Sequence, residues 1–551
     1  MTAFIAENFV PLMFAGLFVF LLTGIPVAFG LAATGLLFGF IGMEAGLFPT
    51  NLFQALPLRV MGIMSNDTLL AIPFFTFMGI ILERSRMAED LLETVGQVFG
   101  PVRGGLAIAV ILVGALLAAT TGVVAAAVIS MGLISLPIML RYGYNRTIAT
   151  GTITASGTLA QAIPPSLVLI VLADQLGRSV GDMYTGAIIP GLVLTGLYVA
   201  YIFLLSILRP SFVPALPLEA RTLGNGVGSL AVALVAVVGI GYAAHVWLYE
   251  TQGANADILG ATIGIIAIYI YALIDKASGI NTMSRLAQQV IMVLIPPLAL
   301  IFLVLGTIFL GIATPTEGGA MGAVGSLFLA AMKNRLNLTV IKGALAATTR
   351  LSAFVMFILI GARVFSLTFY GVEGHKWVEH LLVGLPGGQT GFLIIVSVLV
   401  FLLAFFLDFF ELAFIIVPLL IAPAEALGID LIWFGIILAV NMQTSFMHPP
   451  FGFALFYLRS VAPRGSYVDK VTGIKTAGVS TGEIYLGAIP FVIIQVVMVG
   501  VVIAFPQLVM HYKGVAVDPS TVEIIVPGFA PAVPGGGIGG APTLGAPVFT
   551  P

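Results

Sequence analysis

Two long uncharged stretches of the chain each contain a pair of adjacent prolines that follows several polar side chains. The first stretch covers residues 147–173 with the pair Pro164-Pro165, and the second covers residues 431–458 with the pair Pro449-Pro450. Proline lacks a backbone N–H and clashes with the preceding helical turn, so a helix breaks near each pair. Inside a bilayer such a break persists only where side chains, neighbouring backbone or a bound ion satisfy the freed carbonyl groups. The pattern therefore predicts two broken transmembrane helices around a binding site for a small solute.

The composition indicates a membrane protein. Of the 551 residues, 60% are hydrophobic and 8% are charged, against about 25% charged residues in soluble domains. About a dozen apolar stretches reach the roughly 20 residues that cross the hydrocarbon core. They lack the alternation of transmembrane strands, so we expect an all-α polytopic membrane protein. The net charge of −2 gives no nucleic-acid footprint, and the absence of cysteine excludes disulfides, thiol catalysis and cysteine metal sites.

The uncharged segment before the first broken helix suits a re-entrant hairpin. Residues 104–140 are too long for one span and too short for two full spans with a turn. We predict the hairpin tip at Thr120-Thr121-Gly122, where two hydroxyl groups adjoin a flexible glycine.

The second half of the chain repeats this plan. A second hairpin is expected around Asp408, where Asp408 and Glu411 interrupt an apolar run. The landmarks keep one spacing, because Pro449 follows Pro164, Pro450 follows Pro165 and Gly428 follows Gly143 by 285 positions each. Related halves with interrupted helices are typical of secondary transporters built from inverted repeats, with the site at the repeat interface.

The chain is accordingly divided into seven segments. We expect scaffold helices and a first arm in 1–100, the first transport half in 101–210 with its broken helix at 147–173, an accessory helix pair and linker in 211–285, scaffold helices and a second arm in 286–388, the second transport half in 389–460 with its broken helix at 431–458, a terminal helix region in 461–510, and a poorly ordered Pro/Gly-rich tail in 511–551.

The polar residues of the breaks suit a hard monovalent cation such as sodium, which prefers carbonyl, hydroxyl and amide oxygens. The predicted ion or substrate ligands form two clusters: Thr120, Thr121, Gly122, Ser156, Gly157, Thr158, Pro164 and Pro165 in the first half, and Asp408, Asn441, Gln443, Thr444, Ser445, Pro449 and Pro450 in the second. Helix N-termini at the breaks could attract an anionic substrate. Neither broken segment contains arginine, so a substrate carboxylate would rely on amides, hydroxyls and dipoles.

Several of these residues also have a structural interpretation. Serine and threonine in membrane helices commonly bond back to their own helix, although clustering favours function here. For Asp408 we favour function over a position at a water boundary, and for Glu411 neither. Glu317 is expected to cap a helix N-terminus. His448 could relay protons, but a hydrogen bond to a neighbouring helix is the commoner role. No transition-metal site or cofactor is expected, because the histidines are dispersed.

Together these motifs resemble a known family. Ala155-Ser156-Gly157-Thr158 before Pro164-Pro165, the motif Thr314-Pro315-Thr316-Glu317, and Asn441 before Pro449-Pro450 are similar to motifs of the large membrane subunit of tripartite ATP-independent periplasmic (TRAP) transporters, over about 10–210 and 290–505. The resemblance implies a sodium-driven elevator-type importer of organic acids in the bacterial inner membrane. It also implies a small four-helix membrane subunit and a soluble periplasmic substrate-binding protein as partners. The chain departs from the family pattern at the first hairpin tip and at Gln443, Ser445 and His448.

Two other functions remain open at this point. The chain could be a stand-alone sodium/dicarboxylate permease, which would work without a soluble binding protein. It could also be an intramembrane hydrolase that uses Ser156 with His448. No base is placed near that serine by the sequence, and the polar groups recur in pairs as ion sites require. We therefore expect a transporter and not an enzyme.

Overall fold

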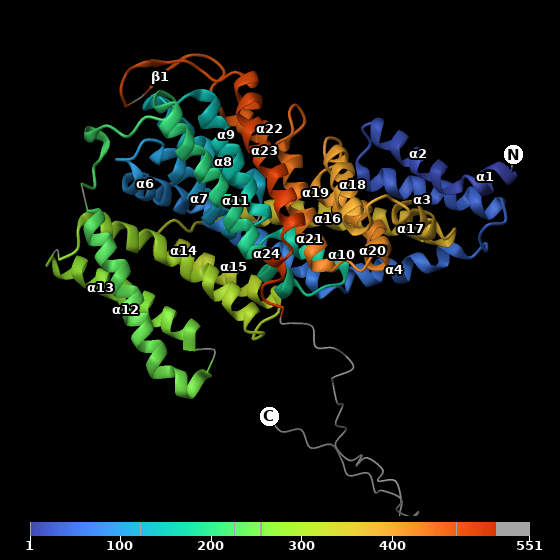
Figure 1. Cartoon of the computed structure of the whole chain (residues 1–551), viewed down its shortest axis with the longest axis horizontal. Coiled ribbons are helices and arrows are strands. Elements are labelled where there is room, and N and C mark those ends of the chain that lie inside the picture. Colours follow the sequence, from blue (N-terminus) through green and yellow to red (C-terminus); the bar gives the residue numbers. More distant parts are fainter. Residues whose placement is uncertain are drawn as a thin grey trace, which may run out of the picture. The chain divides into compact units, whose positions relative to one another are not determined.

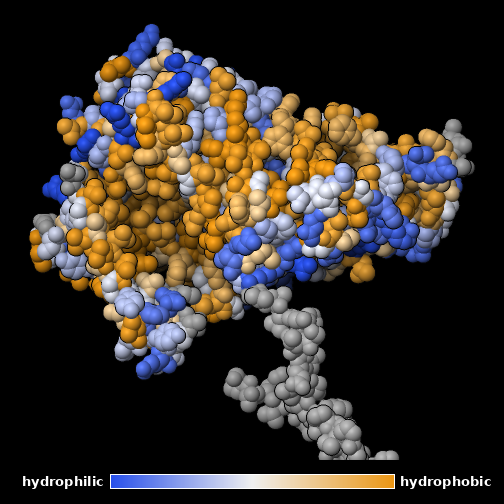
Figure 2. Space-filling model, viewed as in Figure 1, coloured by the Kyte–Doolittle hydropathy of each residue, from blue (hydrophilic) through white to orange (hydrophobic). Residues whose placement is uncertain are grey.

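The computed structural model describes residues 2–121, 123–224, 226–253, 256–280, 282–469 and 471–513. Within these ranges the chain is helical apart from two short strands (Figure 1). Nine of the described helices are long and apolar enough to cross a membrane, or up to eleven spans if each of two bent helix pairs forms one. Apolar side chains cover much of the face in Figure 2. The prediction of an all-α polytopic membrane protein is confirmed. The predicted tail lies outside the described residues from 514 onward.

The N-terminal region supplies long helices and a short arm. Its helices are α1 (Thr2–Glu7), α2 (Phe9–Leu22), α3 (Val27–Glu44), α4 (Leu56–Met64), α5 (Ala71–Arg84) and α6 (Met87–Phe99), with 3-10 turns at Leu52–Ala55 and Asp67–Leu70. Helix α6 begins with Glu89 and Asp90 in its first turn and buries Leu91 and Leu92. It lies in the region 1–100 where a first arm is predicted, and its role as an arm stays a prediction.

The first broken helix and its hairpin follow directly. This half contains α7 (Gly105–Thr121), α8 (Val124–Arg141), α9 (Arg146–Thr158), the 3-10 turn η3 (Leu159–Gln161), α10 (Leu167–Leu176) and α11 (Val180–Leu208), and then 3-10 turns at Pro210–Phe212 and Leu218–Ala220. Helix α9 ends in η3 before the proline pair, and α10 begins after it. The helix therefore breaks where the sequence predicts.

The middle of the chain continues with long helices. These are α12 (Val227–Gln252), α13 (Ala256–Ser278), α14 (Arg285–Phe309), α15 (Pro315–Met332), α16 (Leu338–Gly371) and the second arm, α17 (Gly374–Val383). Helices α12 and α13 form a tight hairpin, because a Cβ on Gly260 would lie 2.6 Å from the Gly241 carbonyl oxygen. At the start of α15, Thr314 and Glu317 form a capping box, so the predicted capping role of Glu317 is confirmed.

The second half repeats the hairpin and the broken helix. It contains α18 (Gly388–Leu403), α19 (Phe409–Glu411), the π-helical turn η7 (Leu412–Ile416), α20 (Val417–Ala426), α21 (Leu431–Met442), the 3-10 turn η8 (Gln443–Phe446), α22 (Phe453–Val461), the strands β1 (Tyr467–Val468) and β2 (Lys475–Thr476), α23 (Thr481–Ala504) and α24 (Gln507–Met510). The strands pair antiparallel in the loop between α22 and α23.

Element bounds support the repeat far beyond three landmarks. Adding 285 to the ends of α8 gives 409 and 426, which are the first residue of α19 and the last residue of α20. The same shift moves the start of α9 to the start of α21. The preceding residues, Asn145 and Asp430, both accept hydrogen bonds from the first backbone N–H groups of their helix. The two halves are therefore built alike although few of their residues match.

The long outer helices interlock the two halves. Helix α5 packs against α15, and α16 packs against α3. Both α3 and α15 are 18 residues long. Each pair thus contains one helix from the first half and one from the second. Such pairing across the halves is expected when two related halves share one core.

The loop between α22 and α23 ties several helices together at one end. Asp469 is almost fully buried and accepts two hydrogen bonds from Arg141, at 3.1 Å from Nε and 3.0 Å from Nη2. Arg459 donates to the Val479 carbonyl, and Arg146 pairs with Glu483 at 2.7 Å. The loop therefore joins the base of the first hairpin to α22, and the pair of Arg146 and Glu483 joins α9 to α23.

We predict that Asp469→Asn destabilises the protein at neutral pH and removes the part of its acid sensitivity that comes from this carboxylate. The Arg141 guanidinium and three donors of the turn that follows hold the pKa of Asp469 well below its usual value. The ordinary pKa of aspartate is about 4. The contribution of ionised Asp469 to the free energy of unfolding is therefore complete above about pH 4 and is lost as the pH falls from there through the lowered pKa. Melting temperatures of wild type and variant should differ at pH 7 and converge below pH 4. Glu93→Gln, at an exposed carboxylate of α6, is the control. Equal melting temperatures at pH 7 would contradict the assignment.

We also predict that the arginine-rich end faces the cytoplasm, following the positive-inside rule. Trp433, in the first turn of α21, donates to Val502 near the far end of α23, so the loop before α21 lies at the opposite end. The chain has no cysteine, so single-cysteine variants can be labelled cleanly. An impermeant maleimide should label Ala426→Cys in intact spheroplasts and Ser466→Cys only after permeabilisation. The reverse labelling pattern would refute this orientation.

Candidate functional site

The first helix break is buried and held closely against the first hairpin. Ser156, Gly157 and Thr158 are buried in the last turn of α9. A Cβ on Gly114 of α7 would lie 2.4 Å from the Ser156 Cβ, and one on Gly157 would lie 2.4 Å from a methyl group of Val128 on α8. Glycine at both positions therefore allows both limbs of the hairpin to pack directly on the break.

The second break contacts its own hairpin in a related way. Asn441, which lies 285 positions after Ser156, donates from Nδ2 to the Ser397 carbonyl of α18 at 2.7 Å. His448 is buried between Phe401 and Phe405, with ring centroids at 4.3 and 4.2 Å. Each break therefore contacts the first limb of the hairpin that precedes it, α7 for the first break and α18 for the second.

The two breaks meet at a pair of equivalent residues. Gln443 Nε2 donates to Thr158 Oγ1 at 3.2 Å, and these residues are 285 positions apart. Both side chains are completely buried. Because equivalent positions of two repeats touch only near the axis that relates them, this hydrogen bond marks the internal pseudo-two-fold axis. Met447 lies beside it, with its sulfur 3.6 Å from Thr158 Oγ1.

Two further polar side chains join this pair from neighbouring helices. Gln495 of α23 donates to Tyr198 of α11 at 2.9 Å, and its Nε2 lies 3.6 Å from Met447 Sδ. Tyr198 also hydrogen-bonds to Thr158. The sequence analysis missed both residues. A signal was present, since Gln495 is the single amide in the apolar stretch 484–505.

Several acceptors around the breaks have no donor within the described part of the chain. These buried atoms are Gln161 Oε1, Gln443 Oε1 and Gln495 Oε1. An unsatisfied buried polar group costs about 1–3 kcal/mol. Neutral amide oxygens are ligands that hard monovalent cations accept. The described residues hold no group of three histidine, aspartate or glutamate side chains for a transition metal, so the donor set fits an ion such as sodium.

The predicted hydroxyl ligands bond to their own helices. Ser156 and Thr158 donate to carbonyls three residues earlier at 2.9 Å each, and Thr444 and Ser445 do so at 2.6 Å each. This is the structural role considered for such residues. The hydroxyl oxygens keep lone pairs for a cation, so their assignment as ligands stays a prediction.

The acidic pair of the second hairpin caps a helix. Asp408 accepts a hydrogen bond from the Glu411 N–H, and Glu411 accepts one from the Asp408 N–H, both at 2.8 Å. This capping box starts α19 after the hairpin tip and accounts for two acids in an apolar segment. An ion-binding role for Asp408 stays a prediction.

The remaining predicted ligands lie at the edges of the site. Pro164 and Pro165 are buried after η3, whereas Pro449 is partly buried and Pro450 is exposed. Both proline pairs are joined by cis peptide bonds. Gly122 and the side chains of Thr120 and Thr121, the predicted first hairpin tip, lie outside the described residues.

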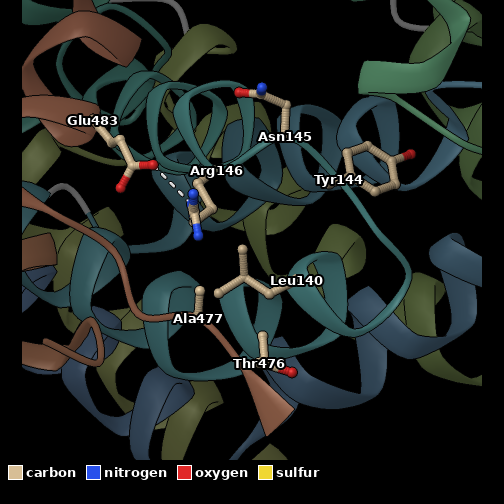
Figure 3. Close-up of a pocket in the computed structure, with 7 residues that line it drawn as sticks. All are labelled: Leu140, Tyr144, Asn145, Arg146, Thr476, Ala477 and Glu483. Atoms are coloured by element: carbon tan, nitrogen blue, oxygen red, sulfur yellow. Dashed lines mark hydrogen bonds and ion pairs between the residues drawn. The ribbon is translucent and has the colours of Figure 1, made fainter. Parts of the chain in front are cut away.

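A separate polar pocket of about 270 Å³ lies at the opposite end of α9 (Figure 3). Arg146 and Glu483 pair across it, at the N-termini of α9 and α23. With a rise of about 1.5 Å per residue, the length of α9 puts it roughly 18 Å from Thr158. We therefore attribute this pocket to the anchoring of α9 on α23 and not to the breaks.

The family model and the relatives found by sequence agree on one family. The family model for the DctM component of tripartite ATP-independent periplasmic transporters matches residues 14–508. A C4-dicarboxylate TRAP transporter large permease from Pseudomonas aeruginosa is 26% identical, over 84% of this chain and 90% of that protein. The ectoine TRAP transporter large permease of Halomonas elongata is 24% identical, over 92% of this chain and 99% of that protein. The Alcanivorax borkumensis YdaH transporter structure has a TM-score of 0.46 at 15% identity, over 83% of this chain and 88% of that protein.

The hydrogen bond between the breaks should be measurable as a coupling energy. We expect a double-mutant cycle of Thr158→Val and Gln443→Met to give a coupling of about 1 kcal/mol in the free energy of unfolding. The cycle can be measured by denaturant unfolding of purified protein in detergent. Thr185→Val replaces a hydroxyl that bonds within α11 and should be additive with Gln443→Met. Additivity of the Thr158 and Gln443 substitutions would argue against a direct contact.

Proposed function

This chain belongs to the DctM component family of tripartite ATP-independent periplasmic transporters, and we propose that it is the sodium-coupled permease subunit for a small organic acid. It is a multi-pass protein of the bacterial inner membrane. The observation that carries the proposal is the contact between two buried helix breaks, one from each half, at Thr158 and Gln443. A buried pair of breaks is the arrangement in which transporters bind coupling ions and substrate.

Sodium is the proposed coupling ion because the donors at the breaks are neutral oxygens. The backbone carbonyls that each break frees, with the hydroxyl and amide oxygens nearby, match a hard monovalent ion. No Asp, Glu, Lys or Arg lies in the segments 147–173 and 431–458. A cation bound there would therefore be repelled by no lysine or arginine of these segments and would be coordinated by neutral oxygens. Ion binding would stabilise the arrangement in which hairpins and breaks enclose the substrate.

The proposed substrate carries a carboxylate. The related permeases named above are described as transporting C4-dicarboxylates and ectoine, two kinds of solute that have a carboxylate group. Helices α10 and α22 begin just after the breaks, and their N-terminal dipoles favour an anion. A carboxylate held by dipoles and amides alone can be released, because no arginine clamps it.

The proposed mechanism is an elevator in which the hairpins and broken helices move against the long outer helices. Its support is the interlocked packing of α3 with α16 and of α5 with α15, which makes a frame shared by both halves. As partners we propose a small four-helix membrane subunit and a soluble periplasmic binding protein that delivers the substrate.

Uptake into proteoliposomes tests this function. The full chain should be reconstituted with its two partner proteins and assayed with labelled succinate and ectoine under a sodium gradient. We expect uptake that is lost when sodium is replaced by choline. Asn441→Ala should raise the sodium concentration for half-maximal uptake by about tenfold, equivalent to 1.4 kcal/mol, because it frees the second break from α18.

The matched control is Asn51→Ala, which changes an exposed asparagine that makes no side-chain cap hydrogen bond to the 3-10 turn Leu52–Ala55 and should leave sodium activation unchanged. Equal uptake in sodium and choline would refute sodium coupling. Full uptake without the binding protein would favour the stand-alone permease.

A further inference from the structure

A deep apolar cavity of about 460 Å³ lies between the N-terminal helices and the second hairpin. Its walls come from α2, the start of α3, the arm α17, α18 and the segment from the hairpin tip to α20, with Phe453 of α22. Glu411 is the one polar residue among the twenty that line it. Since Glu411 accepts a hydrogen bond from the Asp408 backbone, it is engaged by the hairpin tip.

We propose that this cavity binds one acyl chain of a bilayer phospholipid. Several rim residues are apolar and yet exposed, including Phe18 at 45%, Leu22 at 66% and Phe406 at 65%. In a membrane protein such side chains on apolar helices face lipid, so the mouth of the cavity opens toward acyl chains. An empty cavity would forfeit dispersion contacts along its walls, which an entering chain restores.

The other possible occupants fit less well. Water needs two to four polar partners, and these walls offer one carboxyl group that is already engaged. A helix of a partner protein or of a second copy is about 10–12 Å wide, and one seated here would exclude the lipid and leave Trp377 unquenched by it. A phosphate headgroup would find no lysine, arginine or histidine among these walls. A single alkyl chain, inserted tail first, satisfies the size, the polarity and the charge of the site.

The location gives this lipid a mechanical role, and that consequence rests on the proposed function. The acyl chain would lie between α2 and α17 on one side and the hairpin of Asp408 on the other. If the hairpin moves against the outer helices, the acyl chain must slide or leave. The lipid would then control how easily the second hairpin moves.

Tryptophan quenching by brominated phospholipid can detect the bound chain. The protein has three tryptophans, and Trp377 lines the cavity. A full-length variant with Trp247→Phe and Trp433→Phe keeps Trp377 alone. In phosphatidylcholine vesicles with a small fraction of dibromostearoyl chains, we expect Trp377 to be quenched at least twofold more strongly than a reference variant that keeps only Trp433, which is half-buried and donates its indole N–H to the Val502 carbonyl.

Filling the cavity should remove this excess. Leu403→Phe with Leu420→Phe narrows the walls, and the quenching of Trp377 should fall at least twofold. Leu273→Phe, at a 40% exposed position of α13, is the matched control and should have no effect. Quenching of Trp377 that equals that of Trp433, or that survives filling, would overturn the proposal.

A second measurement does not depend on the filled variant folding. Native mass spectrometry of the unsubstituted protein after detergent delipidation should retain one phospholipid per chain, and a chain that carries none would overturn the assignment. Uptake separates this inference from the proposed function. Lipid binding with no sodium-dependent uptake would leave the cavity assignment intact and remove the transport role. Sodium-dependent uptake without bound lipid would remove the cavity assignment and leave the proposed function intact.

Discussion

The structure depends on the cost of leaving backbone hydrogen-bonding groups unpaired inside a bilayer. Two helices stop within the membrane region, after Thr158 and after Met442, and each stop frees carbonyl groups that an unbroken helix would pair. The fold meets this cost by burial against polar partners. Each break is covered by its own hairpin, and the two breaks share a hydrogen bond between Thr158 and Gln443. The hairpins, the tight glycine contacts and the interlocked outer helices all serve to keep these two points together.

Duplication explains how a chain with few matching residues builds such a centre. The equivalent helices start and end at positions 285 apart, while their side chains have diverged. At the axis, threonine in one half meets glutamine in the other, which allows a donor to face an acceptor. At Ser156 and Asn441, divergence changes how each break binds its hairpin.

Much of the site could be predicted because proline acts locally. The proline pairs, the uncharged hairpin segments and the 285-residue spacing all act through backbone chemistry, so the breaks and their repeat were evident from the residues. Tyr198 and Gln495 were missed, because they lie on helices that are continuous at these positions and reach the breaks only through packing. The roles of Asp408 and Glu411 also needed the structure, since acids three positions apart in a chain become reciprocal caps only when a helix begins between them. The first hairpin tip at Thr120 to Gly122 stays a prediction.

The sequence by itself determined that this chain crosses the membrane many times, that two of its helices must break, and that its halves are related. These properties follow from the hydrophobicity, from the missing N–H of proline and from spacing, none of which needs distant contacts. Only the tertiary structure decided which residues meet at the axis, which polar atoms lack partners, and where an apolar cavity opens between the second hairpin and the N-terminal helices. Those features depend on how helices far apart in the chain pack, and packing is set by the shapes of side chains that meet only after folding.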